Sequence, residues 1–164
     1  MPTELNSMYL ASGGKLALAF GTSTTKIYGS VDADTVTIAA GVTAVLDGSF
    51  NRGGDILRVA GNADAYVIGR TSASSAYIES TASKVSIPIG SAGMGIVFAD
   101  GVRSLAYSGG YKIGSQTFTA EPGKITAASD GTVLPTGANP AAQAVVSLLA
   151  AGLSVGTTLD LTIT

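Results

Sequence analysis

The chain has 164 residues, of which only 12% are charged, and its formal net charge is −2. It contains no Cys, His or Trp, which excludes thiol nucleophiles, imidazole bases and the usual zinc sites with nitrogen or sulfur ligands. Any bound metal ion must therefore be held by oxygen atoms, as Ca²⁺ and Mg²⁺ are. The nine basic residues are scattered along the chain, so no nucleic-acid-binding surface is expected.

Short β-prone runs separated by Gly, Asn and Asp dominate residues 15–119. In several of them apolar and polar residues alternate, which is typical of strands with one buried face. The first six strands are predicted over 15–20, 25–28, 35–39, 43–46, 56–60 and 65–70. The other six are predicted over 76–79, 84–89, 95–98, 103–107, 111–113 and 116–119.

The last part of the chain has a different pattern. Asn139 is a good N-cap and is followed by Pro140, so one helix is predicted over 139–151, ending before Gly152. Apolar and polar residues then alternate over 157–164, which predicts a terminal strand. We expect its apolar residues to take part in assembly with other copies of the chain; they are Leu159, Leu161 and Ile163.

These patterns predict an all-β protein with one short C-terminal helix, in three segments: 1–24, a β-rich core over 25–120, and 121–164. Turns recur about every ten residues, which suits either a β-solenoid resembling a parallel β-helix or a β-sandwich. Three segments share a strand that ends on a small-residue turn, beginning at Val36, Leu57 and Val97. This loose, unevenly spaced similarity favours the solenoid.

Acidic and amide side chains are the main candidates for a binding site. Asp32 and Asp34 occupy alternate positions in Gly29-Ser-Val-Asp-Ala-Asp, Asn51 and Asp55 precede one predicted strand, and Asn62 and Asp64 follow it. Ca²⁺ takes about six to eight oxygen ligands from such side chains and from turn carbonyls. The six residues are therefore candidate calcium ligands, although Asp and Asn also form turns through hydrogen bonds to the backbone.

Catalysis finds little support in the sequence. Carboxylate pairs could be drawn from Asp47, Asp55, Glu79 and Asp100, but aromatic residues that could hold a sugar are few. Two Ser-x-x-Lys spacings, at Ser12 and Ser23, open no plausible helix. We therefore expect the protein not to be an enzyme.

Two stretches resemble the repeats-in-toxin nonapeptide: Gly53-Gly-Asp-Ile-Leu and Gly29-Ser-Val-Asp-Ala-Asp-Thr-Val. Residues 25–120 also resemble a module of large surface proteins and adhesins of alphaproteobacteria. The residues that carry this resemblance are Asp34-Thr-Val-Thr-Ile-Ala-Ala-Gly, Phe50-Asn-Arg-Gly-Gly-Asp, Ile87-Pro-Ile-Gly and Val97-Phe-Ala-Asp-Gly. The resemblance implies calcium-linked folding outside the cell and type I secretion directed by an uncleaved C-terminus.

Three functions fit these expectations. The first is a secreted bacterial structural protein that self-assembles into an extracellular filament, matrix fibre or surface layer stabilised by calcium. The second is a stand-alone adhesin that binds a cell-surface glycan or a protein, and the third is a phage or capsid protein. We expect no secretory signal in the first 20 residues, and no apolar run is long enough to span a membrane. We expect an extracellular or cell-surface protein that forms homopolymers.

Overall fold

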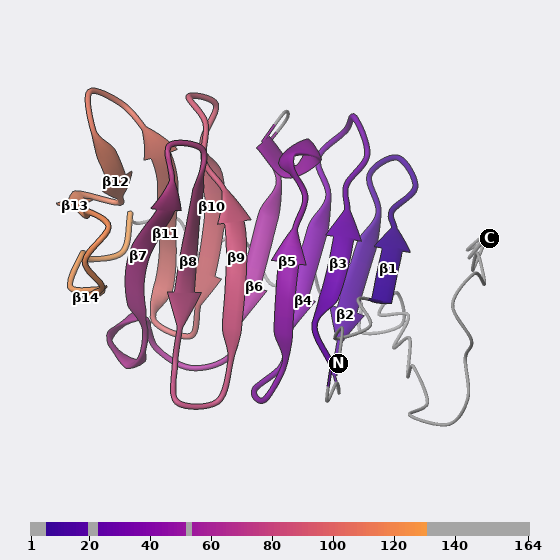
Figure 1. Cartoon of the computed structure of the whole chain (residues 1–164), viewed down its shortest axis with the longest axis horizontal. Helices are drawn as coiled ribbons and strands as arrows, with labels where there is room; N and C mark the ends of the chain where they lie inside the picture. Colours follow the sequence, from indigo (N-terminus) through magenta and orange to yellow (C-terminus); the bar gives the residue numbers. More distant parts are fainter. Residues whose placement is uncertain (1–5, 20–22, 52–53, 131–164) are drawn as a thin grey trace.

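The structure is a computed structural model and describes residues 6–19, 23–51 and 54–130. Its strands form two mixed seven-stranded sheets that face one another, with sheet A in front of sheet B in Figure 1. In spatial order, sheet A contains β1 (Asn6–Tyr9), β3 (Thr25–Tyr28), β5 (Thr43–Leu46), β9 (Lys84–Pro88), β8 (Ser75–Glu79), β7 (Val67–Ser72) and β14 (Gly123–Lys124). Sheet B contains β13 (Gln116–Thr117), β12 (Tyr111–Ile113), β11 (Gly101–Tyr107), β10 (Met94–Phe98), β6 (Ile56–Val59), β4 (Thr35–Ile38) and β2 (Lys15–Leu18).

The first six strands alternate between the two sheets. We call each odd-numbered strand and the next even-numbered one a strand pair, although its two members lie in different sheets. Successive strand pairs lie side by side and parallel, and the series continues through β9 and β10. The parallel strands of sheet B are aligned at Lys15, Thr35, Ile56 and Gly95. Each new strand pair therefore extends both sheets at once.

Antiparallel strands complete the other half of the molecule. In sheet A, β7, β8 and β9 form a meander, with a register shift in β7 between Arg70 and Ser72. In sheet B, β10, β11, β12 and β13 do the same. The structure thus changes from parallel to antiparallel pairing at β9 and β10, which belong to both halves.

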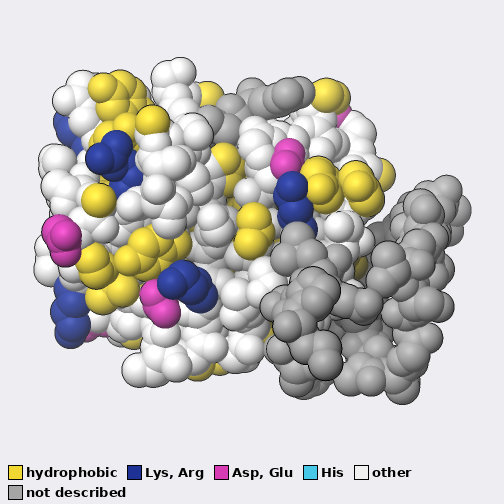
Figure 2. All heavy atoms as spheres, in the orientation of Figure 1, with side chains coloured by type: hydrophobic (Ala, Val, Ile, Leu, Met, Phe, Trp, Pro, Cys, Tyr) yellow, Lys and Arg dark blue, Asp and Glu magenta, His cyan; other side chains and the backbone are white. Residues whose placement is uncertain are grey.

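One apolar core lies between the sheets and runs from Leu16 to Ile125. It forms because buried and partly exposed residues alternate along most strands, as in β4, where Val36 and Ile38 are buried. Burying apolar surface stabilises a protein by about 25 cal/mol per Å², so the burial of these side chains is the main favourable contribution to folding. Charged side chains are few on the face shown in Figure 2, and in two places a basic and an acidic side chain lie against each other.

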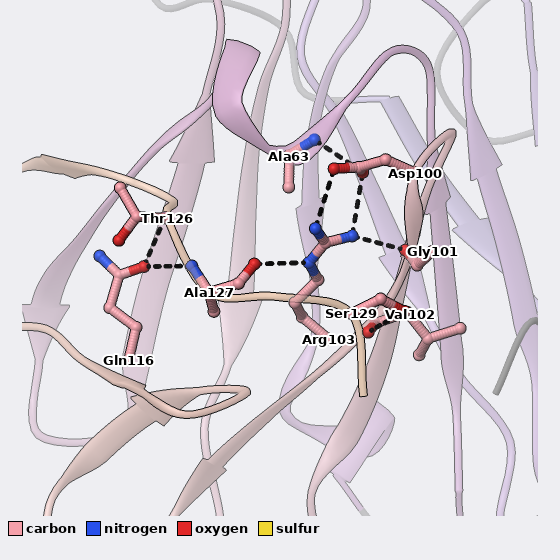
Figure 3. A network of polar contacts seen from close by, with 9 residues as sticks. All are labelled: Ala63, Asp100, Gly101, Val102, Arg103, Gln116, Thr126, Ala127 and Ser129. Atoms are coloured by element: carbon pink, nitrogen blue, oxygen red, sulfur yellow. Dashed lines mark hydrogen bonds and ion pairs between the residues drawn. The ribbon is translucent and has the colours of Figure 1, made fainter. Parts of the chain in front are cut away.

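The antiparallel end of the core is covered by the segment that follows β14. Ile125 and Ala127 are buried there, and Arg103 holds the segment in place through a hydrogen bond from Nε to the Ala127 carbonyl, 3.1 Å long (Figure 3). Arg103 also donates to both carboxylate oxygens of Asp100, at 2.9 and 2.8 Å. Asp100 in turn accepts the backbone N–H of Ala63 at 3.0 Å. Arg103 therefore joins three separate stretches of chain at this end.

Two short 3₁₀ helices interrupt the β structure, η1 (Gly48–Asn51) and η2 (Ala63–Ala65). None of the helices in the described part of the chain is long and apolar enough to cross a membrane.

The expected all-β class is confirmed, and most predicted strands lie within two residues of observed ones. The sequence did not predict β1 or β14, and residues 63–65 form η2, so β7 begins at Val67 instead of 65. The segments that begin at Val36, Leu57 and Val97 fall on β4, β6 and β10, which are neighbours in sheet B. The predicted helix over 139–151 and the strand over 157–164 lie outside the described residues.

Candidate functional site: an aspartate column and an open strand edge

Two of the six candidate calcium ligands lie next to each other in the structure. Asp34 immediately precedes β4 and Asp55 immediately precedes β6, and these strands are paired in parallel with Thr35 beside Ile56. Both side chains are buried, with 1% and 2% of their surface exposed. The same position before β2 is occupied by Gly14. Gly14, Asp34 and Asp55 therefore form a column across three strand pairs, which we call the aspartate column.

Each carboxylate of the aspartate column accepts a backbone N–H from the preceding strand pair. The N–H of Gly14 donates to Oδ1 of Asp34 at 2.7 Å, and the N–H of Asp34 donates to Oδ1 of Asp55 at 2.8 Å. The Ser30 hydroxyl also donates to Oδ1 of Asp34, at 3.0 Å. The Gly14 N–H and the Ser30 hydroxyl offset the cost of burying the Asp34 carboxylate. The column thus satisfies backbone groups where the chain turns from one sheet to the other.

The column is closely packed. A Cβ atom on Gly29 would lie 3.0 Å from Oδ2 of Asp34 and 3.3 Å from the ring of Phe50, which is fully buried. A larger residue at position 29 would shift one of these groups by a few tenths of an ångström, so the glycine favours this close approach.

The other four candidate ligands are placed differently. Asp32 lies in an exposed bend and accepts a hydrogen bond from the Ser12 hydroxyl. Asn62 precedes η2 and Asp64 lies within it, both exposed, while Asn51 ends η1 and its side chain lies outside the described part of the chain. Within 6–19, 23–51 and 54–130, no three acidic side chains come together in a group that could hold a metal ion. Calcium binding by the six residues stays a prediction.

The outer face of sheet A carries a pair of stacked tyrosines that the sequence did not single out as a site. Tyr9 on β1 and Tyr28 on β3 are register partners, and their rings are 4.5 Å apart and nearly parallel, at 8°. They form a cross-strand aromatic pair, in which Tyr9 remains 69% exposed. Lys26 lies over the Tyr28 ring, 4.6 Å from its centre, and pairs with Asp47 at 3.5 Å.

Two carboxylates in ion pairs have lowered pKa values: Asp47, which pairs with Lys26, and Asp100, which pairs with Arg103. Burial opposes ionisation of Asp47, but the Ser49 N–H and Lys26 outweigh it and lower its pKa. Burial likewise opposes ionisation of Asp100, but the hydrogen bonds from Arg103 and from the Ala63 N–H lower its pKa overall. Both groups therefore favour the folded state more when they are ionised.

β1 forms one edge of sheet A, and no strand within the described residues pairs with its outer side. The N–H of Leu10, just after β1, donates to the Tyr28 carbonyl at 2.9 Å. Because backbone N–H groups alternate in direction along a strand, those of Ser7 and Tyr9 point away from β3, toward the edge. β1 contains neither a charged residue nor a proline, two features that usually protect an edge strand.

The other edges of the sheets differ from β1. β13 and β14, at the antiparallel end, have two residues each, and β14 contains Lys124. The edge strand β2 begins with the exposed Lys15. Short strands and lysines are common ways to block pairing at an edge. Of the four sheet edges in the described structure, β1 is therefore the one best suited to accept another strand.

The chain matches no protein-family model, no curated protein and no solved structure. The resemblance to repeats-in-toxin and adhesin modules therefore stays a prediction.

Proposed function

We propose that this protein is an extracellular structural subunit that self-assembles by adding a strand of one subunit to the β1 edge of another. The observation that carries this proposal is the uncharged, four-residue β1 edge, whose outward N–H groups have no strand partner in the described part of the chain. Such an edge is a ready template for another strand.

The donor in this proposal is the strand predicted over 157–164. Its apolar residues, Leu159, Leu161 and Ile163, alternate with polar ones, so they would all face the same side of a sheet. At the β1 edge, Met8 and Leu10 are only partly buried and pack against the core. The apolar face of the donor would cover these two side chains, and its backbone would pair with that of β1.

Donor and acceptor lie in different parts of the sequence, so the contact is head-to-tail. Contacts of this kind that do not close into a ring produce filaments. We further propose that the parallel strand pairs are turns of a short solenoid, as distinct from one half of a sandwich. Subunits joined at β1 would then continue sheet A from one subunit to the next.

Composition supports the proposed location. The chain has no Cys, few charges and 22 glycines, a combination that suits assembly outside bacterial cells through backbone hydrogen bonds. Finding the protein inside unlysed cells or in virions would support the alternative of a phage or capsid protein.

The proposal is tested by negative-stain electron microscopy of the full chain and of two neighbouring variants. Leu161→Asp places a charge on the apolar face of the predicted donor strand, where burial is costly, so filaments should be lost. Thr162→Asp is the matched control, because it adds the same charge to the polar face and should leave filaments intact. Filaments that persist in Leu161→Asp would exclude the terminal strand as donor, and a wild-type protein that stays monomeric would favour a stand-alone binding module.

A further inference from the structure

A cluster of aromatic residues around Arg70 bridges the two sheets at their antiparallel end. Arg70 belongs to β7 of sheet A, and its guanidinium carbon lies 4.5 Å from the ring centre of Tyr111, on β12 of sheet B. Nη1 of Arg70 donates to the Tyr111 hydroxyl at 3.1 Å, and that hydroxyl donates to the carbonyl of Ala73 at 3.1 Å. The guanidinium is thus held in one orientation by the tyrosine.

Within the described residues, no carboxylate forms an ion pair with Arg70. The ion pairs in the described part of the structure join other residues: Lys26 with Asp47, Lys84 with Glu79, and Arg103 with Asp100. Nε of Arg70 is moreover buried without a hydrogen-bond partner, and no other side-chain nitrogen or oxygen of the described residues is in that state. A native structure rarely leaves a buried donor unpaired without a reason.

Two further aromatic side chains lie beside Tyr111. Tyr107 on β11 contacts Tyr111 edge to face, with ring centres 5.0 Å apart, and it remains 49% exposed. The ring centre of Phe118 lies 6.1 Å from that of Tyr111 on a further side. An exposed ring therefore lies against the tyrosine that holds this guanidinium.

We propose that the Arg70 cluster binds a sugar that carries a carboxylate, such as a uronic acid. The edge of a guanidinium formed by Nε and Nη2 matches a carboxylate through two parallel hydrogen bonds, and Nη1, which Tyr111 occupies, is not needed for them. The exposed face of Tyr107 provides an apolar surface for the sugar ring. Because Nε is buried in this structure, the proposal requires the side chains around Arg70 to move when the carboxylate binds. This site is independent of the β1 edge.

Isothermal titration calorimetry at low ionic strength tests the proposal, with an oligogalacturonate as ligand and a glucose oligomer of the same length as the neutral comparison. Wild-type protein should bind the oligogalacturonate in preference. Arg70→Lys keeps the charge but loses the planar pair of donors, and it should bind about tenfold more weakly. Tyr107→Ala, a change at an exposed position, should also weaken binding.

Arg58→Lys is the matched control, because Arg58 is a partly exposed arginine on β6 of sheet B, and its affinity for the oligogalacturonate should equal that of the wild type. Circular dichroism of each variant checks that the fold is kept. The proposal is overturned if the wild type fails to bind the oligogalacturonate, if the neutral oligomer binds equally well, or if the folded Arg70→Lys and Tyr107→Ala variants bind as the wild type does.

Discussion

The carboxylate of Asp55 accepts a hydrogen bond of 2.8 Å from the backbone N–H of Asp34, a residue 21 positions earlier in the chain. Asp34 makes the same kind of contact with the N–H of Gly14, 20 positions earlier still. Because each carboxylate binds the preceding strand pair, the aspartate column fixes the register of three parallel strands at the turn before them. Two of the predicted calcium ligands, Asp34 and Asp55, thus accept hydrogen bonds from the backbone.

The role of the aspartate column can be separated from calcium binding with Asp34→Asn. The amide keeps one oxygen but places an NH₂ group among hydrogen-bond donors, so we expect a loss of about 1–3 kcal/mol in the free energy of unfolding. Urea unfolding should show the same loss with Ca²⁺ and with EDTA. A loss confined to the calcium-containing buffer would instead show that Asp34 binds the ion.

A tyrosine covers a glycine on the outer face of sheet A. A Cβ atom at Gly69 would lie 2.8 to 2.9 Å from atoms of the Tyr77 side chain, its register partner on β8. We expect Gly69→Ala to destabilise the protein by about 1 kcal/mol, because the partly exposed ring of Tyr77 must move away from the sheet. Thermal unfolding in the Tyr77→Ala background should show a smaller effect. Equal effects in both backgrounds would mean that the tyrosine is not the cause.

The ion pair between Asp100 and Arg103 should make stability depend on pH. The pKa of Asp100 is lowered in the folded protein, so its contribution is present above the unfolded value of 3.8 and is lost as the pH falls through the lower, folded value. Near neutral pH, Asp100→Asn should cost about 2 kcal/mol, since it leaves the buried Arg103 without its counter-ion. In urea unfolding, the difference between variant and wild type should shrink as the pH is lowered below 3.8. A difference that is constant with pH would contradict this assignment.

Much of the local β structure could be predicted from the sequence, because alternation of apolar and polar residues is a local signal. β1 was missed since Asn6, Ser7 and Met8 include no β-branched residue, and alternation within four residues is hard to recognise. The placing of Asp34 and Asp55 directly before strands was visible in the sequence, but their hydrogen bonds to a neighbouring strand pair depend on the register of the sheet.

The order of the strands could not be predicted in the same way. β5 pairs with β9 and not with β7, because β7 and β8 are inserted between them in the chain and pair beyond β9. No local pattern distinguishes such an insertion from one more parallel strand. The Arg70 cluster was missed for the same reason, since its residues come from β7, β11 and β12 and meet only in the folded protein.

The β1 edge can be blocked without breaking β1 itself. Ser7→Pro removes an N–H that points outward, so the pairing of β1 with β3 should survive while a further strand can no longer bind. Analytical ultracentrifugation should show monomers for Ser7→Pro and filaments for Ser7→Ala, which keeps the N–H. Filaments of Ser7→Pro would show that assembly uses another surface.

Mixing the two assembly-blocked variants tests the central claim most directly. Ser7→Pro keeps the donor strand but lacks the acceptor edge, whereas Leu161→Asp keeps the edge but lacks the donor. If the terminal strand of one subunit pairs with β1 of the next, an equimolar mixture should form dimers of one copy of each variant that grow no further. Light scattering coupled to size-exclusion chromatography would show these dimers, and a mixture that stays monomeric or forms filaments would contradict the account.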